Sequence, residues 1–562
     1  MNLSSTGAVA LRRAFDFDRL IFWIVAALAA GLLCLFVGYP LLVVLAKSFT
    51  AGDGSFGVAN YVEAFAGRRF LTVLANSIVV SLTVTVLSVS LGFLFAYTLA
   101  RFKVPLRGTM QSVMALPLVA PSLVLGLGVI LLLGRNGVVN RTFGLDLHIY
   151  GFWGIVVADT FYCLPQAVLV LAAALAQADA RPYEAATVLG ASPLKVFTSV
   201  TLPSVRFGIA SAALLVFAVT ITDFGNAMVL GGDYAVLATE IYKQVSGQMN
   251  FSLGAVIAIV LLVPAAVASG LGRMVSRGQA AALSDQALRL EPRPLDTGGW
   301  VLYSMVATLA LMMAATFGTV LVASVVKLWP YDFTLTLKHF SLDIPGGYDS
   351  LANSIKVAIA TAFAGTAVVT AGALLSQKWQ HPVTRFIDLL ATLPAAIPGM
   401  VLGLAYVFAF NDPTNPFTFL YGTLSIIVAC NIFHYHAQGY LTAVTSLKQV
   451  AQTFDEASMT LGASFLQTLR WVLLPAMMPA LGSIAAFFFM RSMVTLSAVI
   501  FLVTPATTLA PVAVLQLDDA GYTSQAAALS MCIIGAVLVS LAFSRTALAF
   551  AGRRPPSRDR MV

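Results

Sequence analysis

The residues that could do chemistry in this chain are polar side chains set inside long apolar stretches. Arg491 directly follows Phe487 to Met490 in one such stretch, and Asp223 lies in another. A charged side chain in an apolar environment costs roughly 3 kcal/mol on membrane-insertion scales unless it meets water, a partner or a ligand. The functional interpretation is a polar path for a solute, in which Arg491 attracts an anion. The structural alternative is that Arg491 pairs with a carboxylate or lies nearer the edge of its apolar stretch.

Four more polar side chains belong to the same predicted path. They are Asp159, Asn431, His434 and Thr495. His434 and His436 are two positions apart, so on a helix they face different directions and make a poor metal pair. For each histidine, the ordinary alternative is an imidazole whose hydrogen bonds are satisfied in the core. We therefore expect neither a metal site nor a catalytic group in this chain.

The composition is that of a membrane protein. The chain is 59% apolar and only 10% charged, with a mean hydropathy of +0.90, whereas a soluble domain has about 25% charged residues. The polar stretches are too short for a soluble enzyme domain, and no phosphate-binding loop is present, so ATP hydrolysis is expected in a separate protein. The four cysteines lie inside apolar stretches at unrelated spacings, which argues against disulfides and against a thiolate metal site.

Twelve apolar stretches have about the 20 residues needed to cross a bilayer, which predicts an all-α polytopic membrane protein. The first follows Arg12, Arg13 and Arg19 and is too long for the core of a cleavable signal. The predicted cytoplasmic segments hold 22 Lys and Arg and the outer segments nine, which puts both termini in the cytoplasm. The net charge of +8 is therefore attributed to topology and contact with anionic lipid, not to nucleic-acid binding. The predicted spans are 20–46, 77–100, 114–133, 155–176, 209–230, 253–271, 300–326, 354–375, 386–410, 424–444, 474–503 and 526–544.

The chain is an internal repeat. Asn76 and the serine after it recur as Asn353 and its following serine, and Glu184 recurs as Glu456 with only a small change in the offset between the copies. Six spans in each half, an even number, predict two pseudo-symmetric halves in parallel orientation that enclose one pore. The predicted division is a first half at 1–272, a cytoplasmic linker at 273–299 and a second half at 300–562.

Two proline pairs interrupt the third and ninth predicted spans. Pro117 and Pro121 in the first half correspond to Pro394 and Pro398 in the second. Proline removes a backbone hydrogen bond, and such breaks are tolerated inside a membrane where they line a cavity or form a hinge. The alternative is a kink that serves packing alone.

Two polar islands between apolar stretches, at 184–203 and 456–475, share one pattern. In each, Glu-Ala begins a short helix, and a glycine six residues after the glutamate, Gly190 or Gly462, suits the left-handed conformation that ends it. A serine then caps a second helix, and Leu-Pro begins the next apolar stretch. We expect a helical hairpin on the inner membrane surface in each half.

This spaced pattern resembles the EAA motif of bacterial ABC-importer permeases, in which Glu-Ala-Ala, glycine and Ile-x-Leu-Pro follow at fixed intervals. The chain departs from it at Val200 and Val472, which replace isoleucine, and at Ser458, which replaces the third alanine. In that family the motif forms the helix that docks into a groove of the cytoplasmic ATPase; the alternative is a pair of amphipathic loops with no special role. The resemblance assigns ATPase coupling to Glu184, Ala185, Gly190, Pro203, Glu456, Ala457, Gly462 and Pro475.

The arrangement of two six-span halves is similar to that of fused permeases of the type I, MetI-like class, and the resemblance covers nearly the whole chain. It implies a bacterial inner (plasma) membrane protein that works with a cytoplasmic ABC ATPase dimer and a periplasmic substrate-binding protein. ATP and Mg²⁺ then belong to the ATPase, and this chain is expected to hold no cofactor of its own.

The stretches at 221–251, 326–340, 410–423 and 512–528 resemble permeases for 2-aminoethylphosphonate, which makes that solute the expected cargo. A zwitterion with a phosphonate group suits a path that holds both Arg491 and Asp223. Fused permeases for ferric iron or for thiamine are the alternatives. A secondary transporter without an ATPase, or a membrane scaffold, would not explain two EAA motifs.

Overall fold

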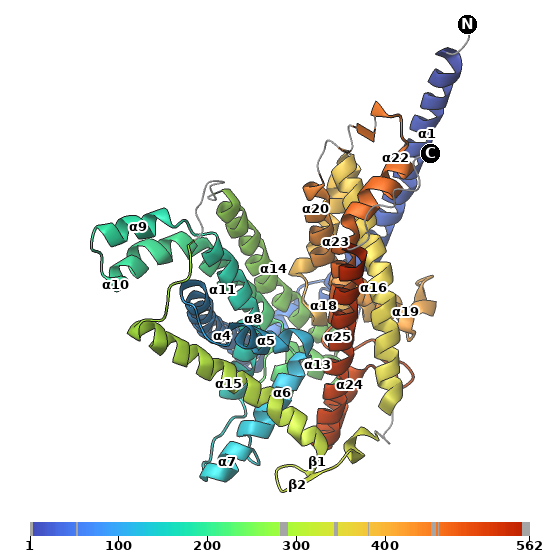
Figure 1. The fold of residues 1–562 in the computed structure, drawn as a ribbon. Coiled ribbons are helices and arrows are strands. Elements are labelled where there is room, and N and C mark those ends of the chain that lie inside the picture. The colour runs from blue at the N-terminus through green and yellow to red at the C-terminus, as the bar shows by residue number, and fades with distance from the viewer. Residues whose placement is uncertain are drawn as a thin grey trace.

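The computed structural model describes residues 4–51, 54–281, 290–341, 347–379, 381–450, 454, 457–458 and 460–552, with side chains described from 19 to 276 and from 290 to 546 within these ranges. These residues are mostly helical, as predicted, and contain one two-stranded hairpin in which β1 pairs with β2 in antiparallel fashion. Figure 1 shows two groups of long helices that meet near α13, α6 and α24. The hairpin β1–β2 and the short helix α7 lie at the same end of the molecule.

The long helices follow the same order in the two halves, whereas the shorter elements between them differ. The first half contains α1 (Ser4–Leu33), η1 (Cys34–Gly38), α2 (Tyr39–Ser48), α3 (Ala59–Ala66), α4 (Arg68–Arg101), α5 (Arg107–Met114), η2 (Leu116–Val119), α6 (Ser122–Leu133), α7 (Val138–Phe143), α8 (Phe152–Ala176), α9 (Arg181–Val188), α10 (Pro193–Val196), η3 (Phe197–Thr201), α11 (Leu202–Ile221), α12 (Gly225–Leu230), α13 (Leu237–Tyr242), η4 (Lys243–Gly247) and α14 (Phe251–Ala281). The second half contains α15 (Thr297–Val325), β1 (Val326–Leu328), β2 (Asp332–Leu335), η5 (Lys338–Phe340), α16 (Gly347–Lys378), α17 (Pro382–Thr392), η6 (Leu393–Ala396), α18 (Gly399–Phe410), η7 (Thr418–Leu420), α19 (Leu424–His434), α20 (His436–Gln449), α22 (Phe465–Thr468), η8 (Leu469–Leu473), α23 (Leu474–Val494), α24 (Ala510–Asp519) and α25 (Thr523–Gly552).

Ten of the described helices are long and apolar enough to cross a membrane, or eleven if the bent pair Pro382–Ala396 and Gly399–Phe410 forms one span. The predicted span 424–444 is missing from both counts, because the chain breaks at Tyr435 and leaves α19 with only 11 residues. Two other predicted spans, 209–230 and 474–503, extend too far, since α11 ends at Ile221 and α23 at Val494. The residues beyond these ends are mostly apolar and buried or half-buried, so hydropathy alone does not reveal where the helices stop.

Widened helical turns precede three prolines. The π-helical segments η1, η3 and η8 end two residues before Pro40, Pro203 and Pro475, and the last two prolines stand in the first turns of α11 and α23. Proline has no N–H, and its ring collides with the carbonyl four residues earlier, so a wider turn lets the helix continue. In η1 the carbonyl of Phe36, which Pro40 cannot bond, accepts a hydrogen bond of 2.8 Å from the fully buried Tyr406 hydroxyl.

The third helix of each half is broken where the proline pairs predict. In the first half α5 leads through the 3₁₀ turn η2 to α6, with Pro117 in the turn and Pro121 directly before α6. In the second half α17, η6 and α18 repeat this arrangement with Pro394 and Pro398, and the two helices meet at 115°. Both α6 and α18 therefore begin among buried residues, where the ends of other helices can reach them.

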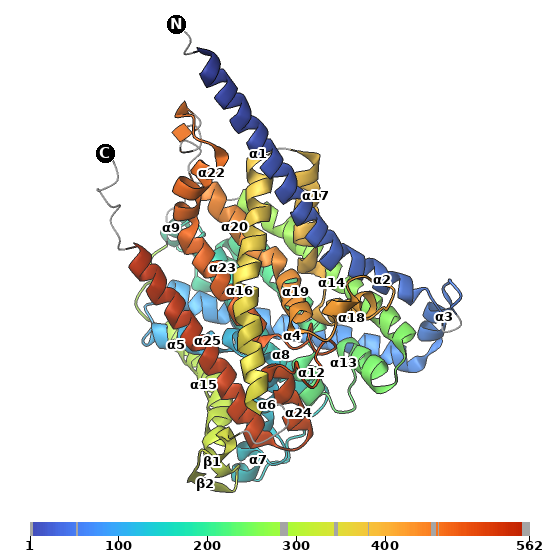
Figure 2. The ribbon, with the colours of Figure 1, turned by 90° about the vertical axis from the view of Figure 1, so that its right-hand side faces the viewer.

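The first helix of each half crosses over to the other half. Helix α1 packs against α16 and α17, and α15 packs against α4, α5 and α6. Figure 2 shows α1 running diagonally beside α16 and α17, and Figure 1 shows α15 beside α6. The two halves therefore interlock, and each bundle is completed by the other's first helix.

Candidate functional site

The first polar island folds, as predicted, into two short helices around a left-handed glycine. Helix α9 carries Glu184 in its first turn, and Gly190 follows the helix with φ of +70°. The Ser192 hydroxyl accepts a hydrogen bond of 3.3 Å from the backbone N–H of Lys195 and so caps α10. Nothing lies within 4 Å of the place where Gly190 would carry a Cβ. The need for glycine there is therefore one of backbone conformation and not of space.

The second island has the same geometry where the structure describes it. Gly462 has φ of +71°, and its Cβ position also faces open space. Ser464 and Gln467 accept each other's backbone N–H groups at 3.4 and 2.9 Å, which caps α22 reciprocally. Ala457 and Ser458 are helical, whereas Glu456 lies outside the described residues.

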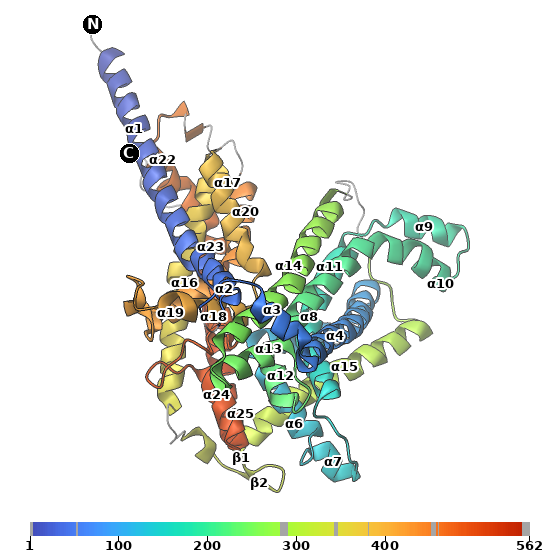
Figure 3. The ribbon, with the colours of Figure 1, turned by 180° about the vertical axis from the view of Figure 1, so that it is seen from behind.

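Both hairpins expose a leucine at the same position. Leu189 is 84% exposed, and Leu461, its counterpart in the second half, is 85% exposed. Val188 and Leu194 extend the apolar surface of the first hairpin. Grouped apolar side chains on a surface mark a contact site. In Figures 1 and 3 the α9–α10 hairpin projects from one side of the molecule, and α22 lies on the other side, near α1.

The predicted path residues of the first half come together where α11 ends. Asp159 lies in α8. Asp223 was predicted to lie within a span, but it lies in the break between α11 and α12. Asn226 joins the two carboxylates: its backbone N–H donates to Asp223 Oδ2 at 2.9 Å, and its side-chain amide donates to Asp159 Oδ1 at 2.7 Å. Asp223 therefore holds an N–H of the first turn of α12 from one residue before the N-cap, a structural role not expected from the sequence.

The second half places amide and hydroxyl groups at the corresponding points. The side-chain amide of Asn431 in α19 donates to Ser492 Oγ at 2.8 Å. Thr495 was predicted to lie within a span, but it lies just past the end of α23. Its hydroxyl lies 2.7 Å from that of Tyr435 and donates to the carbonyl of Arg491 at 2.5 Å. The two halves thus share the positions of their polar groups but differ in charge.

Arg491 lies where the two halves meet. Its guanidinium carbon is 4.8 Å from the centre of the Tyr435 ring, and the group also interacts with the hydroxyl of Tyr162 from α8 of the other half. Tyr162 is close enough to Asp223 to interact with its charge, so it links the guanidinium to the carboxylates of the first half. Among the described residues Arg491 forms no ion pair, which rules out a structural pair with any of their carboxylates. Tyr162 was not among the predicted path residues, because an aromatic residue in an apolar stretch of sequence gives no signal of a polar site.

Several polar atoms of this central cluster have no hydrogen-bond partner. Within the described part of the chain, Asn226 Oδ1, Asn431 Oδ1 and His434 Nδ1 are buried and unbonded. Such atoms are rare in folded proteins, and each costs about 1–3 kcal/mol. The cluster therefore has unmet hydrogen-bonding capacity that water or a polar solute can satisfy.

The two neighbouring histidines differ. His436 Nδ1 lies 3.2 Å from the carbonyl oxygen of Ala391, which fits the ordinary alternative of a satisfied core imidazole. His434 has its ring centre 4.4 Å from that of Tyr435 and lies near Arg491, with Nδ1 unbonded. The described residues contain no group of three or more His, Cys, Asp or Glu side chains arranged to hold a metal ion.

The broken third helices pack against this central cluster through small residues. In the first half Gly225, at the start of α12, lies against Ser122, the first residue of α6. In the second half Gly399, the first residue of α18, lies against Ser497. A Cβ on either glycine would collide with the serine hydroxyl, so each contact takes one serine and one glycine, in opposite order in the two halves.

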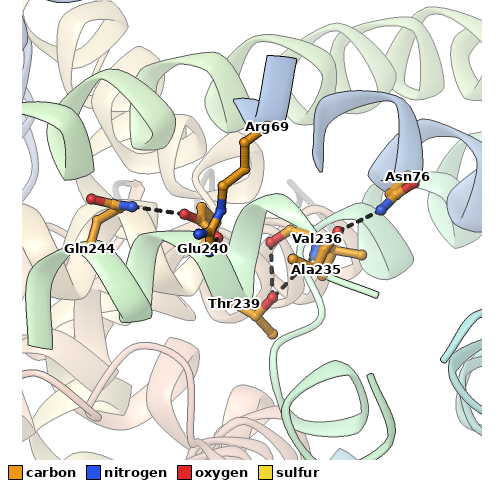
Figure 4. A network of polar contacts seen from close by, with 7 residues as sticks. All are labelled: Arg69, Asn76, Ala235, Val236, Thr239, Glu240 and Gln244. Carbon is orange, nitrogen blue, oxygen red and sulfur yellow. Dashed lines mark hydrogen bonds and ion pairs between the residues drawn. The ribbon is translucent and has the colours of Figure 1, made fainter. Parts of the chain in front are cut away.

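A separate polar network holds the end of α4 that is farther from the hairpins. The Ser77 hydroxyl accepts a hydrogen bond of 2.7 Å from the Leu237 N–H. Figure 4 shows the Asn76 amide, which donates to the Ala235 carbonyl at 3.0 Å. In the second half Ser354 accepts the corresponding bond, from the backbone N–H of the first residue of α24, at 2.8 Å. The repeated Asn-Ser pair thus holds the first turns of α13 and α24.

The first half adds an ion pair to this network. Arg69 Nη2 lies 3.2 Å from Glu240 Oε2, and the Gln244 amide donates to Glu240 Oε1 at 2.8 Å. Figure 4 shows both side chains pointing to the glutamate from opposite sides. The Glu240 side chain is only 4% exposed, whereas the corresponding turn of α24 is apolar at positions 512 and 513. The sequence analysis did not identify this ion pair, because its partners are far apart in the chain.

A comparison with protein families finds one model, described as "Binding-protein-dependent transport system inner membrane component", which matches the chain at residues 88–280 and again at 364–553. The first match runs from within α4 to within α14, and the second from within α16 past the end of α25. Each half of the internal repeat therefore carries one copy.

Curated relatives extend the similarity over nearly the whole chain. A ferric transport system permease protein of Actinobacillus pleuropneumoniae is 30% identical over 546 residues, 93% of this chain and 78% of the relative. A provisionally named ferric transport system permease protein of Haemophilus influenzae is 30% identical over 505 residues, 85% of this chain and 78% of the relative. A provisionally named 2-aminoethylphosphonate transport system permease protein of Salmonella paratyphi A is 27% identical over 225 residues, 39% of this chain and 83% of the relative. The ferric relatives match both halves, whereas the phosphonate relative matches less than half of the chain.

Proposed function

Because the chain belongs to the family of binding-protein-dependent transport system inner membrane components, we propose that its two halves together line the pathway of an importer that a separate ABC ATPase drives. The observation that carries this proposal is the pair of hairpins at α9–α10 and α22. Each has a left-handed glycine, a serine cap and an exposed leucine at equivalent positions. Two equivalent surfaces on one chain suit the two copies of an ATPase dimer.

In this proposal the hairpins dock on the ATPase, and ATP and Mg²⁺ are bound there and not by this chain. Closure of the ATPase dimer draws the hairpins together and opens the pathway toward the binding protein on the opposite face. Both chain termini then lie in the cytoplasm, and the two halves are residues 1–272 and 300–562 joined by the linker 273–299. The coupling residues are Glu184, Ala185, Gly190, Pro203, Glu456, Ala457, Gly462 and Pro475.

We propose ferric iron as the cargo. Support comes from the two relatives named as ferric transport permeases, which are 30% identical over 93% and 85% of this chain. The sequence-based expectation of 2-aminoethylphosphonate ranks below it, because the phosphonate relative covers only 39% of the chain. The stretches that suggested phosphonate are therefore weaker indicators of cargo than similarity over both halves.

One observation keeps an anionic or zwitterionic cargo as the second candidate. Arg491 lies between the halves without an ion-pair partner among the described residues, and a lone guanidinium repels a bare trivalent cation. A phosphonate head would be attracted to it, and so would an anion that accompanies Fe³⁺. The proposed path residues, for either cargo, are Asp223, Arg491, Thr495, Asp159, Asn431 and His434, to which the geometry adds Tyr162.

Uptake by a reconstituted complex tests the proposal. The chain, its ATPase and its binding protein are placed in proteoliposomes, and radioactive Fe³⁺ or labelled 2-aminoethylphosphonate is supplied on the binding-protein side. We expect accumulation of iron that requires Mg²⁺ and ATP on the hairpin side. Phosphonate uptake without iron uptake would select the second candidate, and uptake of either solute without the ATPase would contradict an ATP-driven importer.

A further inference from the structure

The hairpin end of the first half contains a cavity of about 660 Å³. It lies between the last turns of α4, the helix α5 and the last turns of α8, and Leu290 and Pro292 after α14 close one side. Most of its lining is apolar, including Phe95, Met114 and Leu169. This volume is that of a ligand site rather than a packing defect.

The charged part of the lining is cationic, and Gln111 and Gln177 are its neutral polar side chains. Arg101 and Arg107 both line the cavity, and no Asp or Glu among the described residues does. Arg101 is only 8% exposed, and its Nη2 has no hydrogen-bond partner within the part of the chain that the structure describes. A buried guanidinium with an unbonded nitrogen is costly unless an acceptor reaches it, so the cavity favours an anionic group.

The second half has filled the equivalent space. Tyr440 stands at the repeat position where the first half has Val168, and its ring is fully buried. The Tyr440 hydroxyl donates to Asp388 and lies 2.8 Å from the Ser376 hydroxyl; these two residues are the counterparts of two cavity-lining residues of the first half. A tyrosine with two polar partners thus occupies the position that stays open in the first half. In the second half a bulky side chain therefore occupies part of the space that stays open in the first.

From these observations we propose that the cavity binds an anionic phospholipid, with the phosphate between Arg101 and Arg107 and an acyl chain along the apolar lining. The lining decides between a lipid and a soluble anion. A small hydrophilic anion would use the two arginines but leave the apolar walls unmatched, whereas a phospholipid matches both. Basic pockets between membrane helices on the inner side are known sites for acidic head groups.

The site is linked to the first hairpin. The Arg101 guanidinium carbon lies 3.9 Å from the centre of the Tyr183 ring in α9. The segment that follows Pro292 is fixed to the end of α4. The Arg293 N–H donates to the Arg101 carbonyl, and the Lys103 N–H donates to the Arg293 carbonyl, both at 2.9 Å. A phosphate bound to Arg101 would therefore contact the side chain that packs on Tyr183 of α9. This consequence for transport rests on the proposed coupling role of the hairpin, but the binding site itself does not.

Native mass spectrometry of the full, detergent-purified chain tests lipid binding. The probes are dioleoyl-phosphatidylglycerol and dioleoyl-phosphatidylcholine, titrated separately. We expect the parent chain to retain one phosphatidylglycerol with clear preference over phosphatidylcholine. Arg107→Gln removes one exposed cation and should weaken phosphatidylglycerol retention about fivefold, with little change for phosphatidylcholine.

The matched variants are chosen so that a folding defect cannot decide the result. Arg206→Gln removes an exposed cation of the same half outside the cavity and should change nothing. Val168→Tyr copies the second half and should abolish retention of the lipid. Equal retention by the parent, Arg107→Gln and Arg206→Gln would overturn the proposal. Displacement of the bound lipid by millimolar inorganic phosphate would show a site for soluble anions and would overturn it as well.

Discussion

The two halves agree at the hairpins and differ at the central cluster. Gly190 and Gly462 have φ values of +70° and +71°, and the leucines before them are exposed to the same degree. At the centre, the carboxylates of the first half correspond to an amide and a hydroxyl in the second. Arg491 has Val219 as its counterpart. Surfaces that meet two copies of one partner stay alike, whereas a path that orients one cargo can be asymmetric.

The same contrast runs along the length of the molecule. Toward the hairpins the first half has an open cationic cavity and the second a buried Tyr440. At the other end of α4 the first half adds the Arg69–Glu240 pair to a backbone contact that both halves share. Backbone geometry is thus shared between the repeats while charge is not.

Replacing both hairpin glycines by valine should remove the feature in which the halves agree. A β-branched residue at positive φ costs roughly 1–2 kcal/mol per site, and neither site offers a compensating contact. We expect ATP-dependent uptake by the reconstituted Gly190→Val/Gly462→Val variant to fall at least about tenfold with normal membrane insertion. Gly270→Val is the control, since Gly270 also has open space but no positive φ. Parental uptake and ATPase binding by the double variant would refute the docking role.

Replacing Arg491 should remove the feature in which the halves differ most. Arg491→Met leaves the hydroxyls of Tyr162 and Tyr435 without the cation, and we expect uptake of an anionic or anion-complexed cargo to fall roughly tenfold. Arg491→Lys should lower uptake less, because it keeps the positive charge, although it loses the planar guanidinium group. Co-purification with the ATPase should be unchanged in both variants. If Arg491→Met transports as the parent does, the residue is structural.

Breaking the Arg69–Glu240 pair should destabilise the first half in particular. Arg69→Met leaves a carboxylate that is 4% exposed with only Gln244 as partner, and since Arg69 itself is largely exposed we expect a loss of about 1–2 kcal/mol. Thermal unfolding in detergent measures it. Glu240→Gln in the Arg69→Met background should recover part of the loss, and equal midpoints for Arg69→Met and the parent would show that the pair contributes nothing.

The smallest effect concerns α24, whose end carries Asp518 where the first half has Ser246. Burial, with the charge of Asp519 adding to it, raises the pKa of Asp518 to about 6. The folded state therefore holds this proton between about pH 4 and 6 while the unfolded chain loses it, so stability falls as pH rises through that window. Asp518→Asn should raise the unfolding midpoint by about 2 °C above pH 6 and not below pH 4. A gain of the same size at both pH values would point to another cause.

Local interactions are the part of the fold that the sequence predicted well. The hairpins depend on a glutamate-alanine start, a left-handed glycine and a serine cap close together in the chain, and the breaks before α6 and α18 depend on prolines that lie in them. Long apolar stretches likewise predicted most spans. The ends of α11 and α23 were misplaced, because both helices stop among mostly apolar residues, and Asp223, which bonds the first turn of α12, resembles a buried functional group.

The sequence by itself determined that the chain is an all-α membrane protein with two repeated halves and two equivalent hairpins, since hydropathy and capping act over short distances along the chain. The tertiary structure alone decided which polar residues meet. Tyr162 reaches Arg491 across the two halves, Asn226 joins two carboxylates, and Tyr440 fills in one half the cavity that stays open in the other. Most of these contacts join residues that are distant in the chain, so capping patterns and hydropathy, which act over short distances, do not reveal them.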